Sequence, residues 1–193
     1  MVEGVEPPDS RYPSHSSKTA ITRAEGLEVL AQIPAIHLPE LALLPHITAL
    51  NLGDRADAGV GTFPAEPKGE AYPAFVSKLD ADGNEVAGVR MPDVSVPIAT
   101  HTGFAPRHDS NGGDGQILEY MGSSVPFAQT EAIRDKTADP RPSIEARYAD
   151  RDDYLAKISD AAKGLVAERH LLTEDIETCV ELAALRYDAV MNA

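Results

Sequence analysis

Residues 80–85, with the sequence DADGNE, gather oxygen-bearing side chains that could bind a cation. Asp80, Asp82 and Asn84 alternate as the first ligands of an EF-hand calcium loop do. That loop has its glycine at position six, whereas Gly83 stands at position four, and no helices are predicted on either side. Gly and Asn can take the positive φ values of a tight hairpin turn. We therefore predict a turn, and we expect no bound metal or other cofactor.

A second group of candidates follows the next predicted strand, in the sequence THTGF and shortly after it. Functional side chains often lie where a strand passes into a loop, so His101, Thr102, Gly103 and Arg107 are candidates for lining a pocket. A surface histidine with no special role is the alternative for His101. The six histidines show no HExxH spacing, and the single Cys179 excludes an intrachain disulfide and a cysteine-based zinc site.

Two further patterns are incomplete. Residues 108–115, HDSNGGDG, could form an oxygen-rich metal loop or an anion nest, but the same composition is typical of a surface loop. The nucleophile elbow GxSxG occurs nowhere in the sequence. The segment around Ser123 and Ser124, GSSV, comes closest but lacks the second glycine. The sequence therefore offers no complete nucleophile and base.

Composition limits the possible partners. A net charge of −14 opposes binding to nucleic acids and to anionic membranes, so we expect neither as a partner. No apolar run approaches the ~20 residues of a membrane-spanning helix, and the first residues lack the pattern of a signal peptide. The default expectation for location is therefore the cytoplasm. With 193 residues, 42% of them apolar, the chain is long enough for one domain with a core.

The predicted fold is α+β, with short, mostly antiparallel strands and a C-terminal helical hairpin. The N-terminal half is rich in loops and proline, and Pro34, Pro39 and Pro45 divide its most apolar stretch into short pieces. Residues 71–79 and 85–91 predict two strands of a hairpin around the DADGNE turn, and residues 94–100 a third extended piece.

The C-terminal third shows helical periodicity. Asp150 is a candidate N-cap, and an apolar stripe behind it predicts a helix ending near His170. Thr173 is predicted to cap a second amphipathic helix, and Ser143 a short one. The stripes consist of Leu155, Ile158, Ala162, Leu165 and Val166 on the first helix, and of Ile176, Val180, Ala183, Ala184 and Tyr187 on the second.

The expected organisation is a linker or strap over residues 1–24 and a single accessory domain over residues 25–193. Within that domain, residues 25–100 are expected to be β-rich, residues 101–142 to hold loops and short elements, and residues 143–193 to be helical.

Two stretches carry a family resemblance. LDADGNEVAGVRMPDVSVPIATHTGF, residues 79–104, and MGSSVPFAQTEAIRDKTADPRPSIEARYADRDDYL, residues 121–155, occur in this order. Together with PPDSRYP near the start, they resemble the C-terminal part of a bacterial family of α/β-hydrolase-domain proteins. The likeness covers nearly the whole chain and is weakest over residues 14–70.

This resemblance implies a serine esterase-type protein whose nucleophile elbow and catalytic histidine lie upstream of Met1, so it places no catalytic residue on this chain. The family usually has an aromatic residue where His101 stands. We therefore expect a C-terminal accessory segment that is inactive alone. Its expected partner is the upstream hydrolase domain, and self-association is possible without that domain. The alternative is a self-standing, non-catalytic binding or structural module.

Overall fold

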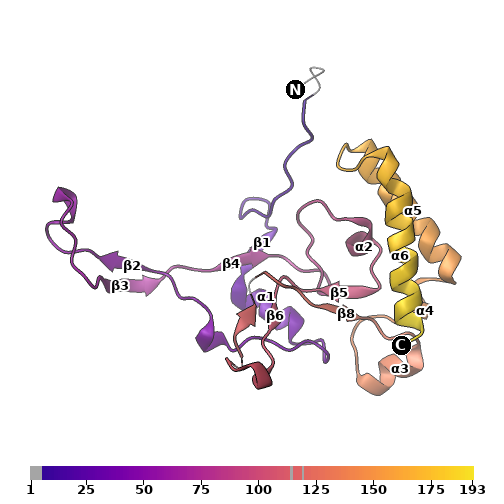
Figure 1. Ribbon diagram of the computed structural model, residues 1–193, viewed down its shortest axis with the longest axis horizontal. Coiled ribbons are helices and arrows are strands. Elements are labelled where there is room, and N and C mark those ends of the chain that lie inside the picture. Colours follow the sequence, from indigo (N-terminus) through magenta and orange to yellow (C-terminus); the bar gives the residue numbers. More distant parts are fainter. Residues whose placement is uncertain (1–5, 114, 119) are drawn as a thin grey trace.

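The computed structural model describes residues 6–113, 115–118 and 120–193, and it shows an α+β fold, as predicted. Short antiparallel strand pairs are spread over residues 20–126, and the longest helices lie at the C-terminal end of the chain (Figure 1). The strand pairs are β1 (Ala20–Thr22) with β4 (Phe75–Ser77), β2 (Thr48–Asn51) with β3 (Glu66–Ala71), β5 (Ala99–His101) with β8 (Ser124–Pro126), and β6 (Ala105–Pro106) with β7 (Ile117–Leu118).

The helices alternate with these pairs early in the chain and then follow one another. They are α1 (Arg23–Leu30), α2 (Pro92–Ser95), α3 (Glu131–Thr137), α4 (Ile144–Arg147), α5 (Arg151–Ala167) and α6 (Ile176–Met191). Single 3₁₀ turns are η1 (Leu41–Leu43), η2 (Ala56–Ala58), η3 (Asp109–Asn111) and η4 (Thr173–Asp175). No helix in the described part of the chain combines the length and the apolar character needed to cross a bilayer.

The helical hairpin of α5 and α6 is confirmed. The Asp150 carboxylate accepts the backbone N–H of Asp153 at 2.8 Å and so caps α5, as the sequence predicted. Ile158, Ala162 and Leu165 are buried on one face of the helix. Tyr154 is buried beside them and stacks on Tyr187 of α6, with ring centroids 5.2 Å apart. The stripe had missed Tyr154, because tyrosine is as common on surfaces as in cores.

The start of α6 differs from the prediction. Thr173 opens the 3₁₀ turn η4, and α6 then begins at Ile176 without a side-chain cap. Ser143 does cap α4, where its hydroxyl accepts the N–H of Ala146. The core joins the helices to the β5–β8 pair, and its buried members are Ile98, Phe127, Ile144, Tyr148, Tyr154, Ile158, Ala183 and Tyr187.

The hairpin predicted around DADGNE is only partly correct. Residues 80–84 do make the tight turn, but the ladder beyond it stops after a single bridge between Leu79 and Glu85. β4 pairs instead with β1, which lies within the N-terminal segment expected as a strap. Downstream, the Gly88 N–H donates to the carbonyl of Arg11. Competing partners for the backbone groups on both sides therefore end the hairpin early.

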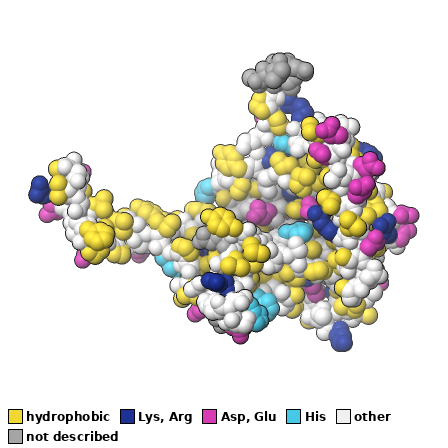
Figure 2. Space-filling view, in the orientation of Figure 1, with side chains coloured by type: hydrophobic (Ala, Val, Ile, Leu, Met, Phe, Trp, Pro, Cys, Tyr) yellow, Lys and Arg dark blue, Asp and Glu magenta, His cyan; other side chains and the backbone are white. Residues whose placement is uncertain are grey.

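The β2–β3 pair forms an arm, defined here as residues 47–72. Figure 1 shows the arm extending away from the rest of the described chain, which we call the body. Every residue of β3 is exposed, and Figure 2 shows apolar side chains along the arm. The arm falls within residues 25–100, which were expected to be β-rich, and β3 contains Pro67 and Gly69 although both residues disfavour a strand.

The core should be sensitive to truncation in the helical hairpin. Ile158 is fully buried, so Ile158→Ala should lower the free energy of unfolding by about 2–5 kcal/mol, through lost transfer energy and a cavity. Urea unfolding followed by circular dichroism measures the change. Leu185→Ala, on the exposed face of α6, is the matched control and should shift the midpoint little. Equal midpoints for both variants would contradict this core.

Candidate functional site

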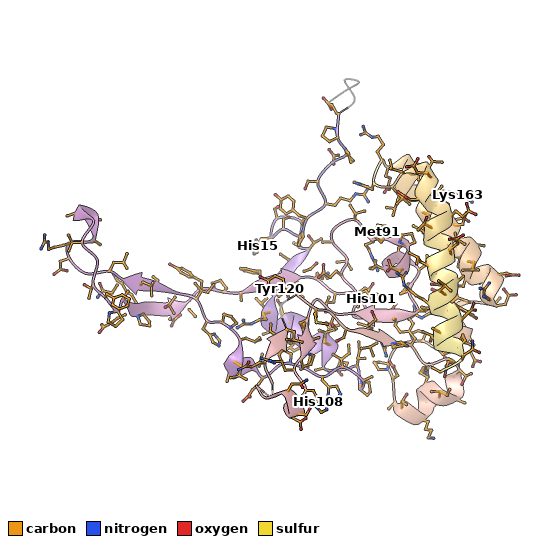
Figure 3. All side chains as sticks on the ribbon, in the orientation of Figure 1. His15, Met91, His101, His108, Tyr120 and Lys163 are labelled. Atoms are coloured by element: carbon orange, nitrogen blue, oxygen red, sulfur yellow. The ribbon has the colours of Figure 1, made fainter. Side chains whose placement is uncertain are left out.

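The candidate site surrounds the β5–β8 pair, in which His101 lies directly opposite Ser124. Two strands of three residues cannot hold a site by themselves, because an isolated two-stranded pair is marginal in water. The DADGNE turn supports β5 on one side, and residues 139–147 support β5 and β8 from the C-terminal side. Figure 3 shows His101 at the end of β5 and His108 in a separate loop.

The DADGNE turn is built from its own polar groups. One oxygen of Asp80 accepts the backbone N–H groups of Asp82 and Asn84, both at 3.0 Å, and the other accepts from Arg90 at 2.7 Å. Gly83 has a φ of +78°, and a Cβ there would lie 2.9 Å from the Thr100 side chain. Only glycine therefore allows the turn to approach β5 this closely.

Asn84 replaces a neighbouring strand for β5. Its side chain is fully buried, donates to the carbonyl of Ala99 at 3.0 Å and accepts the N–H of His101 at 2.8 Å. One amide side chain thus satisfies an acceptor and a donor that would otherwise be left without partners at this edge. Asn84, which the sequence analysis grouped with Asp80 and Asp82 as a possible metal ligand, therefore has a structural role: its side chain binds the backbone of β5.

The Asp82 carboxylate also has a protein partner. It forms an ion pair with Arg147 of α4, with Oδ2 and Nη1 2.9 Å apart. Asp80 is paired in the same way with Arg90. Within residues 6–113, 115–118 and 120–193, no group of three His, Cys, Asp or Glu side chains is arranged to hold a metal ion.

Arg141 joins the strand pair to the helical part of the chain. Only 1% of its side chain is exposed, and its Nη1 donates to the Thr100 hydroxyl at 2.8 Å and to the Val125 carbonyl at 3.0 Å. Its Nε and Nη2 bind both carboxylate oxygens of Asp139, at 2.9 and 2.6 Å. The ring of Phe127 contacts both Arg141 and Arg147, whose guanidinium carbons lie 4.9 and 4.4 Å from its centroid.

The titration of Asp139 follows from this contact. Burial acts to raise the pKa of Asp139, but the hydrogen bonds and charge of Arg141, with a contribution from Arg134, lower it below the ordinary value of 3.8. A carboxyl whose pKa is lower in the folded chain stabilises the fold at neutral pH. That contribution is complete above the unfolded-state pKa and disappears as the pH falls through the folded-state pKa.

The side chains of His101 and Ser124 form a contact that resembles a nucleophile with its base. The His101 Nδ1 and the Ser124 Oγ lie 3.0 Å apart. Cross-strand neighbours are normally this close, so the register of β5 and β8 explains the contact. In the described part of the chain no side chain hydrogen-bonds to His101 Nε2, and Ser124 lies within a strand rather than on a strand-to-helix elbow.

The four residues proposed to line a pocket fall into two adjoining hollows. Thr102 and Arg107 line a hollow of about 590 Å³, named here the Arg107 hollow. His101, Gly103 and again Thr102 line a shallower depression of about 260 Å³. Thr102 is therefore the residue that the two share, and the four do not converge on one point.

The Arg107 hollow also has members that sequence reasoning did not propose. They are contributed by residues 35–38, by η3 with its flanks, and by β8 with its preceding loop, and the polar ones are His37, His108, Asp109 and Ser123. The HDSNGGDG pattern pointed to His108, but no sequence signal places His37 near it. Arg107 supplies the positively charged side chain of this hollow.

Comparison with known proteins places the chain in a family. Residues 11–181 match the family model described as "Alpha/beta hydrolase domain". This match covers most of the sequence, and the chain belongs to that family. No curated protein and no solved structure gives a significant match to it.

Removing Arg141 should unfold much of what it joins. Arg141→Met should lower the free energy of unfolding at neutral pH by about 3–5 kcal/mol, because the buried Asp139 carboxylate loses its partner. Urea unfolding is the measurement, and Arg55→Met, on the exposed arm, is the control. The deficit should shrink below about pH 4, where Asp139 becomes protonated and no longer needs a cation. A deficit that stays constant from neutral pH into acid would contradict this role of the pair.

Proposed function

We propose that this chain is the C-terminal accessory segment of an α/β-hydrolase of the serine esterase type. The observation that carries the proposal is the match of residues 11–181 to the α/β-hydrolase domain family, in a sequence that contains no GxSxG elbow. A hydrolase of this type needs a serine on a strained turn, a histidine and an orienting acid. The catalytic domain that supplies these groups is the proposed partner.

The accessory role is supported by the way the site is built. The turn, Arg141 and the β5–β8 pair form a rigid support, since their buried polar groups are satisfied by one another. The Arg107 hollow lies beside this support, is open on the described surface and combines the positive charge of Arg107 with apolar neighbours such as Phe104 and Val125. We propose that it forms one wall of the substrate pocket, with the catalytic groups contributed from the other side.

An alternative is a self-standing, non-catalytic binding module. The same hollow favours it, because a concave surface with a few polar groups is a general ligand-binding feature. The two functions differ in whether a catalytic domain binds this surface, and that is what the following experiments measure.

The isolated chain should not hydrolyse p-nitrophenyl acetate or butyrate above the buffer rate. The His101–Ser124 contact lacks both the elbow and a third group on Nε2 in the described residues, so it should not activate the serine. Ser124→Ala and His101→Ala, with Ser123→Ala as the neighbouring control, should leave the rate unchanged. Turnover that disappears in Ser124→Ala and His101→Ala but persists in Ser123→Ala would make the chain an esterase in its own right.

Assembly should create activity that depends on the Arg107 hollow. We would co-express the chain with the GxSxG-containing segment of a full-length family member and purify by a tag on one partner. A 1:1 complex that hydrolyses esters is the expected result. Arg107→Ala should raise the KM of this complex severalfold, whereas Lys163→Ala, on the exposed face of α5, should leave it unchanged. Failure to form any complex, together with a well-behaved isolated chain, would favour the binding module.

A further inference from the structure

The arm of residues 47–72 is not explained by the site or by the proposed function. It is a two-stranded hairpin in which every residue of β3 is exposed, and a hairpin of two strands is marginally stable alone. Figure 2 shows it projecting well beyond the body with apolar side chains on its surface. Six large apolar side chains on it are between 47% and 97% exposed: Ile47, Leu50, Leu52, Val60, Phe63 and Tyr72.

Phe63 is the most exposed of these side chains, at 97%, and it lies beyond β2 in the connection that leads back to β3. The backbone N–H of Thr62 donates to the carbonyl of Leu52, so Phe63 lies near the ends of the two strands, with η2 further out along the arm. A phenyl ring that stands free in water on a projecting element gains free energy when it enters an apolar hollow. Aromatic side chains of this kind are the commonest anchors of protein interfaces.

A matching hollow lies at the base of the arm. It has a volume of about 290 Å³, and its apolar lining includes Leu27 of α1, Leu44 just before β2, Val76 of β4, Phe104 and Ile117. A cavity of ~150 Å³ lined by aliphatic side chains already accepts benzene, so this arm-base hollow has room for the ring of Phe63. The hollow adjoins the arm, since Leu44 shortly precedes β2 and Val76 shortly follows β3 in the sequence.

Symmetry brings these two features together. When two identical arms lie side by side and antiparallel about a two-fold axis, a contact between Phe63 of one arm and the base of the other is repeated by the second copy. The two arms then overlap along their strands, and η2 of each lies beyond the base of the other. The contact is then made twice, as in other isologous dimers, and it closes the assembly. Pro67, which has no amide hydrogen, and Gly69, at φ +77°, make β3 a poor template for adding further strands. The arm is therefore suited to side-chain packing in a closed pair.

The available area is sufficient for such a pair. With roughly 150–250 Å² for an aromatic side chain and about 150 Å² for an aliphatic one, the six apolar side chains expose on the order of 700 Å² on each arm. Two arms and the surfaces they cover then exceed the ~1,000 Å² that a specific interface needs. We propose that the chain forms a two-fold dimer by exchanging arms, with Phe63 of each copy seated in the arm-base hollow of the other. This proposal does not depend on the proposed catalytic partner.

Sedimentation equilibrium on the full chain tests the proposal. Wild-type protein at tens of micromolar should have twice the monomer mass of 20.6 kDa. Phe63→Asp should weaken the dimer at least about tenfold in Kd, because a central aromatic anchor is replaced by a charge. Phe63 is almost fully exposed, so this change should leave the circular dichroism spectrum intact. Leu185→Asp, at an exposed position of α6, is the control and should dimerise like wild type. A wild-type monomer, or a Phe63→Asp dimer of unchanged Kd, would overturn the proposal.

A cross-linking experiment tests where Phe63 lies. The photoreactive analogue p-benzoylphenylalanine is placed at position 63, and isotopically heavy and light chains are mixed before irradiation. Mass spectrometry should find heavy-to-light cross-links to peptides that contain Leu27, Val76 or Ile117. Cross-links from position 63 of one copy to position 63 of the other, or to α6, would reject the arrangement. The arrangement is also rejected if a catalytic segment of a family member binds the chain, dissolves the dimer and takes over the cross-links from position 63. That result would leave the proposed function standing.

Discussion

The buried guanidinium of Arg141 is the interaction on which the rest of the body depends. It is nearly inaccessible to water, so each of its N–H groups must find an acceptor within the chain. The acceptors come from three separate segments, namely Thr100 of β5, Val125 of β8 and Asp139 before α4. A charge in this position makes the fold specific, because any arrangement that moves one segment leaves a buried charge without a partner. The short strands β5 and β8 need such a constraint, since three-residue pairs have little stability of their own.

The DADGNE turn extends the same constraint to the N-terminal half. Asp82 pairs with Arg147, whose guanidinium lies over the same Phe127 ring that Arg141 contacts. Asn84 completes the free edge of β5, and Gly83 lets the turn reach it. A sequence that looks like a set of calcium ligands is therefore a connector, and its carboxylates neutralise arginines inside the protein. The position of glycine within the motif was the sequence feature that separated these two interpretations.

How far the sequence predicted this protein differs between local and long-range features. The Asp150 and Ser143 caps, the stripe of Ile158 and the DADGNE turn are set by neighbouring residues, and all were predicted correctly. The pairing of β4 with β1 was missed because it joins residues far apart in the chain, and period-two patterns do not encode partners. For the same reason, the residues that line the Arg107 hollow were only partly predicted. Thr102 and Arg107 were proposed from one segment, whereas His37 reaches the same hollow from another. Buried Arg141 was not singled out, since an arginine is read as a surface residue until its partners are known.

The body and the arm therefore differ in what stabilises their short strands. In the body, buried side chains such as Asn84 and Arg141 replace the neighbouring strands that β5 and β8 lack, and they bind the backbone of these strands within one chain. Among residues 47–72, all of which the structure describes, no side chain is buried in this way, and every residue of β3 is exposed. An element without internal support that still presents apolar side chains can be stabilised only by another surface. The contrast explains why the candidate site can be described from one copy of the chain. The arm, in the dimer that we propose, is stabilised when a second copy covers its apolar side chains.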